Sequence, residues 1–207
     1  MLDTAQAENL FNKLYGEIKG YEISTASRAK ETNVDSSRML YGELPFTTWK
    51  EIVERTNPKK DGVFFDLGSG TGRIALESFL IHPFKKVVGV ELLQGLHNKA
   101  CEVKEIFEKN FKPAIAENFS DRELQLINGD IFKTNLSEAD FIFMNHPFKD
   151  GEIFMELEKK FLQELKRGTK ITTIIRALKS PEFKQLGKQT YKFSWGDSTV
   201  HFCEVWA

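Results

Sequence analysis

The feature that most constrains the fold of this chain is a glycine-dense turn between two apolar segments. Residues 62–67 form an apolar run that enters the turn Gly68-Ser69-Gly70-Thr71-Gly72, and a second apolar run, residues 86–91, ends on Glu91. The segment between them, residues 71–81, has the pattern of a helix. Strand, glycine turn, helix and strand make the first half of a nucleotide-binding α/β unit, in which ligands bind at the carboxyl ends of parallel strands.

The spacing of the glycines and one carboxylate indicate the kind of ligand. Gly68, Gly70 and Gly72 lack the Cβ that would keep a ligand away from the backbone. Their pattern, G-x-G-x-G, differs from the dinucleotide fingerprint G-x-G-x-x-G, and Asp66 would repel a pyrophosphate. S-adenosylmethionine (SAM) carries a sulfonium and an ammonium group and no phosphate, so we predict a SAM site. A turn without a ligand is the alternative, because glycine-rich turns are common after strands.

Two further acidic residues follow at the ends of the next predicted strands. Glu91 lies 19 residues after Gly72, close to the ~20 at which a carboxylate reaches ribose hydroxyls and accepts their hydrogens. Asp130 follows a strand at residues 123–128, where it can accept from the adenine amine while Ile131 or Phe132 packs on the ring. A solvated glutamate at the end of its strand and a simple Asn-Gly-Asp turn are the structural alternatives.

The order of the predicted elements indicates an α/β fold: a Rossmann-like, seven-stranded class I methyltransferase sheet with a terminal β-hairpin and a small N-terminal helical extension. We expect helices over residues 5–19, 46–57, 71–81, 93–110 and 152–166, and strands over 62–67, 86–91, 123–128, 140–145, 169–175, 191–195 and 199–206. The polar residues 22–38 are either a short helix or a mobile connector. The last two strands alternate and are joined by Gly196-Asp197, which predicts a hairpin whose final strand is antiparallel.

The composition is that of one enzyme-sized domain. The 207 residues carry a net charge of −1 without a basic tail, so we expect no strong nonspecific binding of nucleic acid. Cys101, Cys203 and the four histidines lack metal-type spacing, so no metal site is predicted. Nothing near Met1 resembles a signal peptide and no apolar run approaches ~18 residues, so we expect a cytoplasmic protein without a membrane span.

The fourth predicted strand of the sheet ends beside the expected position of the transferred methyl group. It is followed by Asn145-His146-Pro147-Phe148, which is similar to the N-P-P-[YF] loop of methyltransferases acting on amino groups of bases or of glutamine. Asn145 can accept a hydrogen bond from an incoming amine, and Phe148 can wall or stack on the acceptor. His146 replaces the first proline of that pattern, and a simple strand-end turn is the structural alternative.

Five elements in sequence order resemble the non-SET histone-lysine methyltransferases of the disruptor-of-telomeric-silencing class. They are Tyr41-Gly42-Glu43, Asp66–Gly72, Gly89–Glu91, Gly129–Ile131 and Phe143–Asn145. The resemblance covers roughly residues 38–206, and its Tyr-Gly-Glu element is the most specific. It implies a SAM-dependent N-methyltransferase acting on a protein lysine, with Tyr41 and Glu43 closing over the methionine part of the cofactor. We divide the chain into an N-terminal helical segment with a cofactor-covering loop, residues 1–57, and a SAM-binding methyltransferase domain, residues 58–207.

The chain departs from that class at positions that bear on its substrate. Arg73 stands where the class has Gln, Phe202 where it has a Tyr of the lysine channel, and its basic nucleosome-binding segment has no counterpart. We expect Phe148 and Phe202 to lower the pKa of the acceptor lysine by desolvation. His146 is either the proton acceptor or an exposed loop histidine. The functional alternatives are an N-methyltransferase acting on an RNA or DNA base and a non-catalytic SAM- or nucleoside-binding protein.

Overall fold

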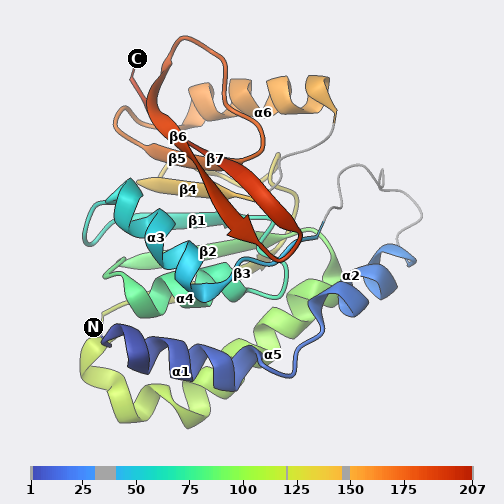
Figure 1. The fold of residues 1–207 in the computed structure, drawn as a ribbon, viewed down its shortest axis with the longest axis vertical. Helices are drawn as coiled ribbons and strands as arrows, with labels where there is room; N and C mark the ends of the chain where they lie inside the picture. Colours follow the sequence, from blue (N-terminus) through green and yellow to red (C-terminus); the bar gives the residue numbers. More distant parts are fainter. Residues whose placement is uncertain (1, 31–40, 120, 146–149, 207) are drawn as a thin grey trace.

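The protein is built on a seven-stranded sheet whose strands follow the order β3-β2-β1-β4-β5-β7-β6 (Figure 1). The computed structural model describes residues 2–30, 41–119, 121–145 and 150–206. The strands are β1 Val63–Leu67, β2 Lys86–Glu91, β3 Glu123–Asn128, β4 Phe141–Met144, β5 Lys170–Ile174, β6 Phe183–Phe193 and β7 Gly196–Val205. Strands β1 to β5 pair in parallel, and β7 is antiparallel to both β5 and β6. The predicted Rossmann-like sheet with an antiparallel final strand is confirmed.

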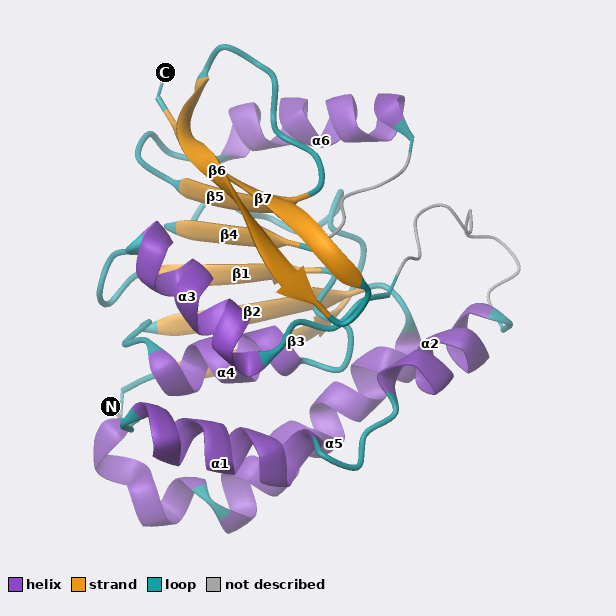
Figure 2. Cartoon of the chain, viewed as in Figure 1, coloured by secondary structure: helices purple, strands orange, loops and turns teal. Residues whose placement is uncertain are grey.

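Helices cover both faces of the sheet (Figure 2). They are α1 Thr4–Tyr15, α2 Gly20–Arg28, α3 Phe46–Thr56, α4 Arg73–Ile81, α5 Gln94–Asn110 and α6 Gly151–Glu164, with a short 3-10 segment at Lys112–Asn118. Side chains of β1 alternate between the faces: Phe64 joins a cluster with α1, α3 and α4, while Phe65 joins a cluster with α6. Because both faces are covered, the central strands are continuous apolar runs.

The helix predicted over residues 5–19 is shorter in the structure, and the short helix that was one of two alternatives for residues 22–38 is present up to Arg28. Helix α1 ends at Tyr15, and α2 begins at Gly20. Asp3 caps α1 through a hydrogen bond from the backbone N–H of Gln6 at 2.8 Å. The break allows α2 to turn toward α5, where Ser27 Oγ accepts from the N–H of Gly95 at 3.1 Å. Ile18 continues the apolar spacing past the end of α1 and packs against the same apolar cluster from the connector, which is why the helix was predicted too long.

Strand β6 is longer than predicted. It begins at Phe183 rather than near residue 191, and residues 184–190 are exposed. A strand at the edge of a sheet needs no apolar alternation, because its pairing with β7 supplies its stability.

The predicted division of the chain at residues 57 and 58 stays a prediction, although α1, α3 and β1 share one apolar cluster. Among the described residues no helix is long and apolar enough to cross a bilayer.

Candidate active site

The glycine turn lies at the carboxyl end of β1, where the strand order reverses between β2 and β4. Ligands of open α/β sheets bind at such a point. Gly68, Gly70 and Gly72 have φ angles of 81°, 56° and 78°, which other residues rarely adopt. The N–H of Gly68 donates to the carbonyl oxygen of Val90 at 2.9 Å. The turn is therefore fixed against β2 in a conformation that requires glycine.

The three glycines have different surroundings. Among the described residues, no heavy atom lies within 4 Å of a Cβ placed on Gly68. A Cβ on Gly70 would lie 2.8 Å from Cε2 of Tyr41, and one on Gly72 would lie 3.1 Å from the Cβ of Ala100 in α5. Gly70 is thus covered by Tyr41, whereas Gly72 lets α5 pack against the turn. Close approach of a cofactor to all three glycines stays a prediction, with helix packing as a second reason for Gly72.

Glu91 holds the turn with both of its carboxylate oxygens. Oε2 accepts from the N–H of Gly70 at 2.8 Å, and Oε1 accepts from the N–H of Leu93 at 2.8 Å. The side chain is only 7% exposed, and burial raises its pKa. The alternative of a solvated glutamate is therefore wrong. Each oxygen keeps a further lone pair, which leaves two acceptors for a ribose diol.

Asp66 is a buried carboxylate with an unsatisfied oxygen. Its side chain is 2% exposed, and Oδ2 has no hydrogen-bond partner within the described part of the chain. Burial, reinforced by the nearby charge of Glu91, raises the pKa of Asp66 to about 8. A buried, unpaired carboxylate is unfavourable, and a bound cation would relieve that cost. The arrangement fits the ammonium group of SAM.

Asp130 lies at the same edge of the sheet, in the turn after β3. Its Oδ1 accepts from the N–H of Phe132 at 2.9 Å, so the carboxylate has a structural role in its own turn. Asn128 joins this turn to β2, because its Nδ2 donates to the carbonyl oxygen of Glu91 at 2.9 Å. Ile131 is partly buried against the apolar cluster on the α6 face. The contacts of Asp130 and Ile131 with adenine stay predictions.

Tyr41 and Glu43 lie over the glycine turn and are held there by α2. Tyr41 Oη donates to Glu43 Oε1 at 2.7 Å and lies 3.3 Å from Thr71 Oγ1. Burial raises the pKa of Tyr41, so its hydroxyl keeps its proton. A Cβ on Gly20, the first residue of α2, would lie 2.0 Å from Tyr41 Oη, and the Tyr21 ring meets the Tyr41 ring edge-on with 5.3 Å between centroids. We call residues 41–45 the covering segment.

Asn145 joins the end of β4 to the covering segment. Its Nδ2 donates to the carbonyl oxygen of Gly42 at 2.9 Å, while its Oδ1 is buried and accepts no hydrogen bond from the residues that the structure describes. Trp195 lies against Gly42, where a Cβ would be 2.5 Å from Cζ3 of the indole, and it stacks on Phe193 with 4.8 Å between ring centroids. A free amide oxygen near an aromatic wall can accept a hydrogen bond from an amine.

The predicted walls of the acceptor channel are only partly placed. Phe148 and the proposed proton acceptor His146 lie outside the described residues. Phe202 is 3% exposed, and the guanidinium of Arg55 lies 4.7 Å from its ring centroid. Phe202 pairs with Thr172 of β5, so it lies deeper in the sheet than Asn145. Its role as a channel wall stays a prediction.

Arg73, where the chain departs from the resembling class, packs between α1 and the covering segment. Its guanidinium carbon lies 4.8 Å and 4.9 Å from the ring centroids of Phe11 and Tyr15. Its Nη1 is 4.0 Å from Glu43 Oε2, and in the described ranges its buried Nε has no hydrogen-bond partner. The arginine therefore adds a positive charge beside Glu43 that glutamine would not supply.

Gly20, Tyr21 and Trp195 belong to the site, and the sequence analysis did not identify them as site residues. They come from α2 and the terminal hairpin, far from the glycine turn in sequence. No spacing rule links such distant segments. The hairpin predicted over residues 191–206 places Trp195 next to its turn, but that pattern does not indicate which segment the side chain covers.

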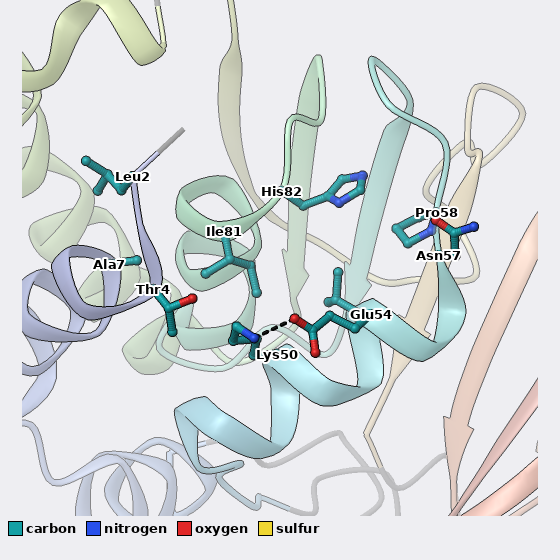
Figure 3. A pocket seen from close by; sticks show the side chains of 10 residues that line it. Leu2, Thr4, Ala7, Lys50, Glu54, Asn57, Pro58, Ile81 and His82 are labelled. Carbon is teal, nitrogen blue, oxygen red and sulfur yellow. Dashed lines mark hydrogen bonds and ion pairs between the residues drawn. The ribbon is translucent and has the colours of Figure 1, made fainter.

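A separate hollow of about 290 Å³ lies between α1, α3 and the end of α4 (Figure 3). His82 and the Lys50–Glu54 ion pair line it. His82 and Asn57 precede β2 and β1, so this hollow lies toward the amino ends of the strands and is distinct from the site at their carboxyl ends. In the parts of the chain that are described, no group of three His, Cys, Asp or Glu residues is arranged to hold a metal ion.

Comparison with known proteins gives one family. The family model described as "Histone methylation protein DOT1" matches residues 21–202. The H3 lysine-79 specific histone-lysine N-methyltransferase of Caenorhabditis elegans is 31% identical over 138 residues, which are 64% of this chain and 14% of that protein. The same-named protein of Cryptococcus neoformans is 31% identical over 160 residues, 74% of this chain and 23% of that protein. The chain thus spans less than a quarter of these two relatives.

Solved structures of other proteins have a fold similar to that of this chain. An RNA methyltransferase from Salinibacter ruber in complex with S-adenosyl-L-homocysteine has a TM-score of 0.58 and 22% identity, covering 79% of this chain and 94% of that one. TrmN from Thermus thermophilus has a TM-score of 0.58 and 20% identity, covering 82% and 52%. At this identity the likeness establishes the fold alone.

Proposed function

The chain belongs to the family of the histone methylation protein DOT1, and from this membership we propose that it transfers a methyl group from SAM to the amine of a protein lysine. The observation that carries the proposal is Asn145. Its Nδ2 is held by the carbonyl oxygen of Gly42, so its buried Oδ1 is fixed in place without a partner among the described residues. An unsatisfied buried acceptor is unfavourable by about 1–3 kcal/mol, and an incoming amine would satisfy it.

The residues at the carboxyl end of β1 and β2 fit SAM. Asp66 offers a buried carboxylate oxygen to the ammonium group, and Glu91 keeps two lone pairs for the ribose hydroxyls. Tyr41 and Glu43 already lie over the turn, as a segment that closes on the methionine part must. When bound, SAM supplies a methyl group on a positively charged sulfur. The protein then has to position the acceptor in line and keep water out.

The acceptor amine must lose its proton before it can attack. At pH 7 the deprotonation of a lysine with a pKa of ~10.4 costs roughly 4–5 kcal/mol. Desolvation lowers that pKa, because a buried ammonium loses its hydration. Trp195 beside Gly42 supplies an apolar wall near Asn145. Asn145 would orient the neutral amine by accepting one of its N–H hydrogens.

The physiological acceptor is proposed as a protein with an accessible lysine. Histone H3 is the first candidate, since the curated relatives carry that substrate in their names. The expectation of weak nonspecific nucleic-acid binding rests on the net charge of −1. A cytoplasmic location likewise stays a prediction.

The experiment is a labelling assay. The purified protein is incubated with tritiated SAM and either recombinant histone H3 or a cell lysate, and the labelled fraction is digested with protease or nuclease. We expect protease-sensitive label, located on a lysine side chain by mass spectrometry. Asn145→Ala should label far less. Asn98→Ala on the exposed face of α5 is the matched control, because it makes the same chemical change away from the site.

Other outcomes identify the alternatives. Nuclease-sensitive label on a base amine would replace the lysine proposal with a base N-methyltransferase, which the sequence Asn145-His146-Pro147-Phe148 favours. SAM binding by calorimetry without label on any acceptor would favour a non-catalytic SAM-binding protein.

A further inference from the structure

The turn after β5 contains an isoleucine in a strained conformation. Ile175 has a φ angle of 74°, in a region that β-branched residues almost never adopt. The other non-glycine residues with positive φ in the described part of the chain are Asn57 and Asp61, types that tolerate it. The N–H of Arg176 donates to the carbonyl oxygen of Ile174 at 2.9 Å, so Ile175 is the centre of the rare γ-turn with positive φ.

Neighbouring groups hold this turn in place. The N–H of Ile175 donates to the carbonyl oxygen of Thr199 in β7 at 2.8 Å. The hydroxyl of Thr173 donates to the carbonyl oxygen of Arg176 at 2.5 Å. Strain of this kind persists where the surroundings over-determine it, and such positions cluster at functional sites.

The register of β4 and β5 brings Ile175 close to Asn145 in position at the carboxyl edge of the sheet. Met144 of β4 pairs with Thr173 of β5, so Asn145 follows level with Ile174, and Ile175 comes one residue later. Ile174 is fully buried, whereas Ile175 is 44% exposed. The strain therefore does not serve to bury Ile175 in the core. It leaves an exposed apolar residue one position beyond the point level with Asn145, the residue proposed to orient the acceptor.

We propose that Ile175 is a substrate-contact residue that packs against the methylene stem of the acceptor lysine at the entrance to the site. This inference rests on the proposed lysine N-methyltransferase function and adds a specificity-determining residue to it. A lysine has four apolar methylenes below its amine. With the amine at Asn145, the stem has to cross the carboxyl edge of β4 and β5 on its way out to the substrate backbone.

Methyl NMR tests the contact directly. The protein is labelled with ¹³C at the isoleucine δ1 methyl groups, and Ile175 is assigned as the resonance lost in Ile175→Val. We expect this resonance to shift when Nα-acetyl-lysine methylamide is added in the presence of S-adenosylhomocysteine. The resonance of Ile106, equally exposed on α5, should not move. An unmoved Ile175 resonance while another isoleucine methyl shifts would overturn the inference.

Kinetics and stability test its consequence. Ile175→Gly removes the side chain and the strain together, so its Tm should equal or exceed that of the unaltered protein, while the KM for the labelled protein acceptor rises at least fivefold. The dissociation constant for SAM should change less than twofold. Ile175→Val should have a KM within twofold of that of the unaltered protein, and Ile106→Ala should leave the KM unchanged.

The outcomes separate this inference from the function on which it rests. If the unaltered protein labels lysine and Ile175→Gly does so with an unchanged KM, the contact is wrong and the lysine function stands. A fall in Tm with unchanged KM would mean that Ile175 only packs locally. If the unaltered protein labels no lysine, the proposed function itself fails.

Discussion

Asp66 and Glu91 lie near the carboxyl ends of neighbouring strands, but their carboxylate oxygens differ in hydrogen bonding. Both oxygens of Glu91 accept backbone hydrogen bonds, whereas Oδ2 of Asp66 has none from the described residues. Glu91 is therefore needed for the turn with or without a cofactor. Asp66 instead destabilises the protein whenever it carries its charge without a bound cation.

This difference predicts that the stability of the cofactor-free protein depends on pH. The pKa of Asp66 is raised from 3.8 to about 8, so the free protein holds a proton there that the unfolded chain has lost. The stabilisation that comes from this more tightly held proton is fully present below about pH 4 and is lost as the pH rises toward 8. Asp66→Asn should raise the Tm of the cofactor-free protein at pH 7 and weaken the fall of Tm between pH 5 and 8.

The protonation state of Asp66 should also affect the affinity for SAM. An ammonium group favours ionised Asp66, so SAM affinity measured by calorimetry should increase from pH 5.5 to 7, by up to about tenfold per pH unit. Adenosine lacks the ammonium group and is the control ligand, whose affinity should change much less. Equal pH dependence for both ligands, or its persistence in Asp66→Asn, would assign the proton to another group.

Asn145 is predicted to act on the acceptor more than on the cofactor. Asn145→Ala should lower kcat by at least ~10²-fold, the scale of a positioning defect, because the amine loses its acceptor. SAM affinity, measured by calorimetry, should change less than threefold, since the ribose and the ammonium group are predicted to contact Glu91 and Asp66. If Asn145→Ala were as active as the reference variant Asn98→Ala, another residue would have to orient the amine.

At the scale of elements, α2 and the terminal hairpin fix the covering segment from two sides. Gly20 of α2 contacts the Tyr41–Glu43 pair. From the hairpin, Ser194 Oγ donates to the carbonyl oxygen of Glu43 at 3.0 Å, and Trp195 covers Gly42. The two elements are more than 150 residues apart in sequence. Residues 41–43 of the segment are thus held by tertiary contacts from both elements.

Gly20→Ala tests this arrangement. The new Cβ would lie 2.0 Å from Tyr41 Oη, so α2 and the covering segment cannot both keep their positions. We expect SAM affinity to fall at least tenfold by calorimetry, with an unchanged far-UV circular dichroism spectrum. Gly151→Ala is the matched control, because no described atom lies within 4 Å of its Cβ. Unaltered SAM affinity in Gly20→Ala would show that α2 does not hold the segment.

At the scale of the whole molecule, Trp49 links α3 to the central strands. It is fully buried, contacts Phe64, Phe141 and Phe143, and donates from Nε1 to Ser78 Oγ of α4 at 2.9 Å. One side chain therefore joins two helices to β1 and β4. A defect there should affect cooperative unfolding and not the site alone.

Trp49→Ala should destabilise the protein by about 3–5 kcal/mol, the usual cost of such a cavity. For a chain of this size that corresponds to a fall in Tm of roughly 6–20 °C, measured by calorimetry. Trp206→Ala, at a position 49% exposed, should lower Tm by less than about 2 °C. A similar small effect for both would mean that the core around Trp49 repacks.

The sequence by itself determined the sheet, the glycine turn and the acidic residues at the strand ends. Val63–Leu67, Gly68 and Glu91 are predictable because their signals are local: apolar runs, positive φ at glycine and a fixed distance along the chain. The tertiary structure decided that α2 packs against α5, that Gly20 and Trp195 lie against the covering segment, and that Ile175 is strained. Those features depend on contacts between segments far apart in sequence, and a pattern read along one chain carries no information about which distant backbone will lie against it.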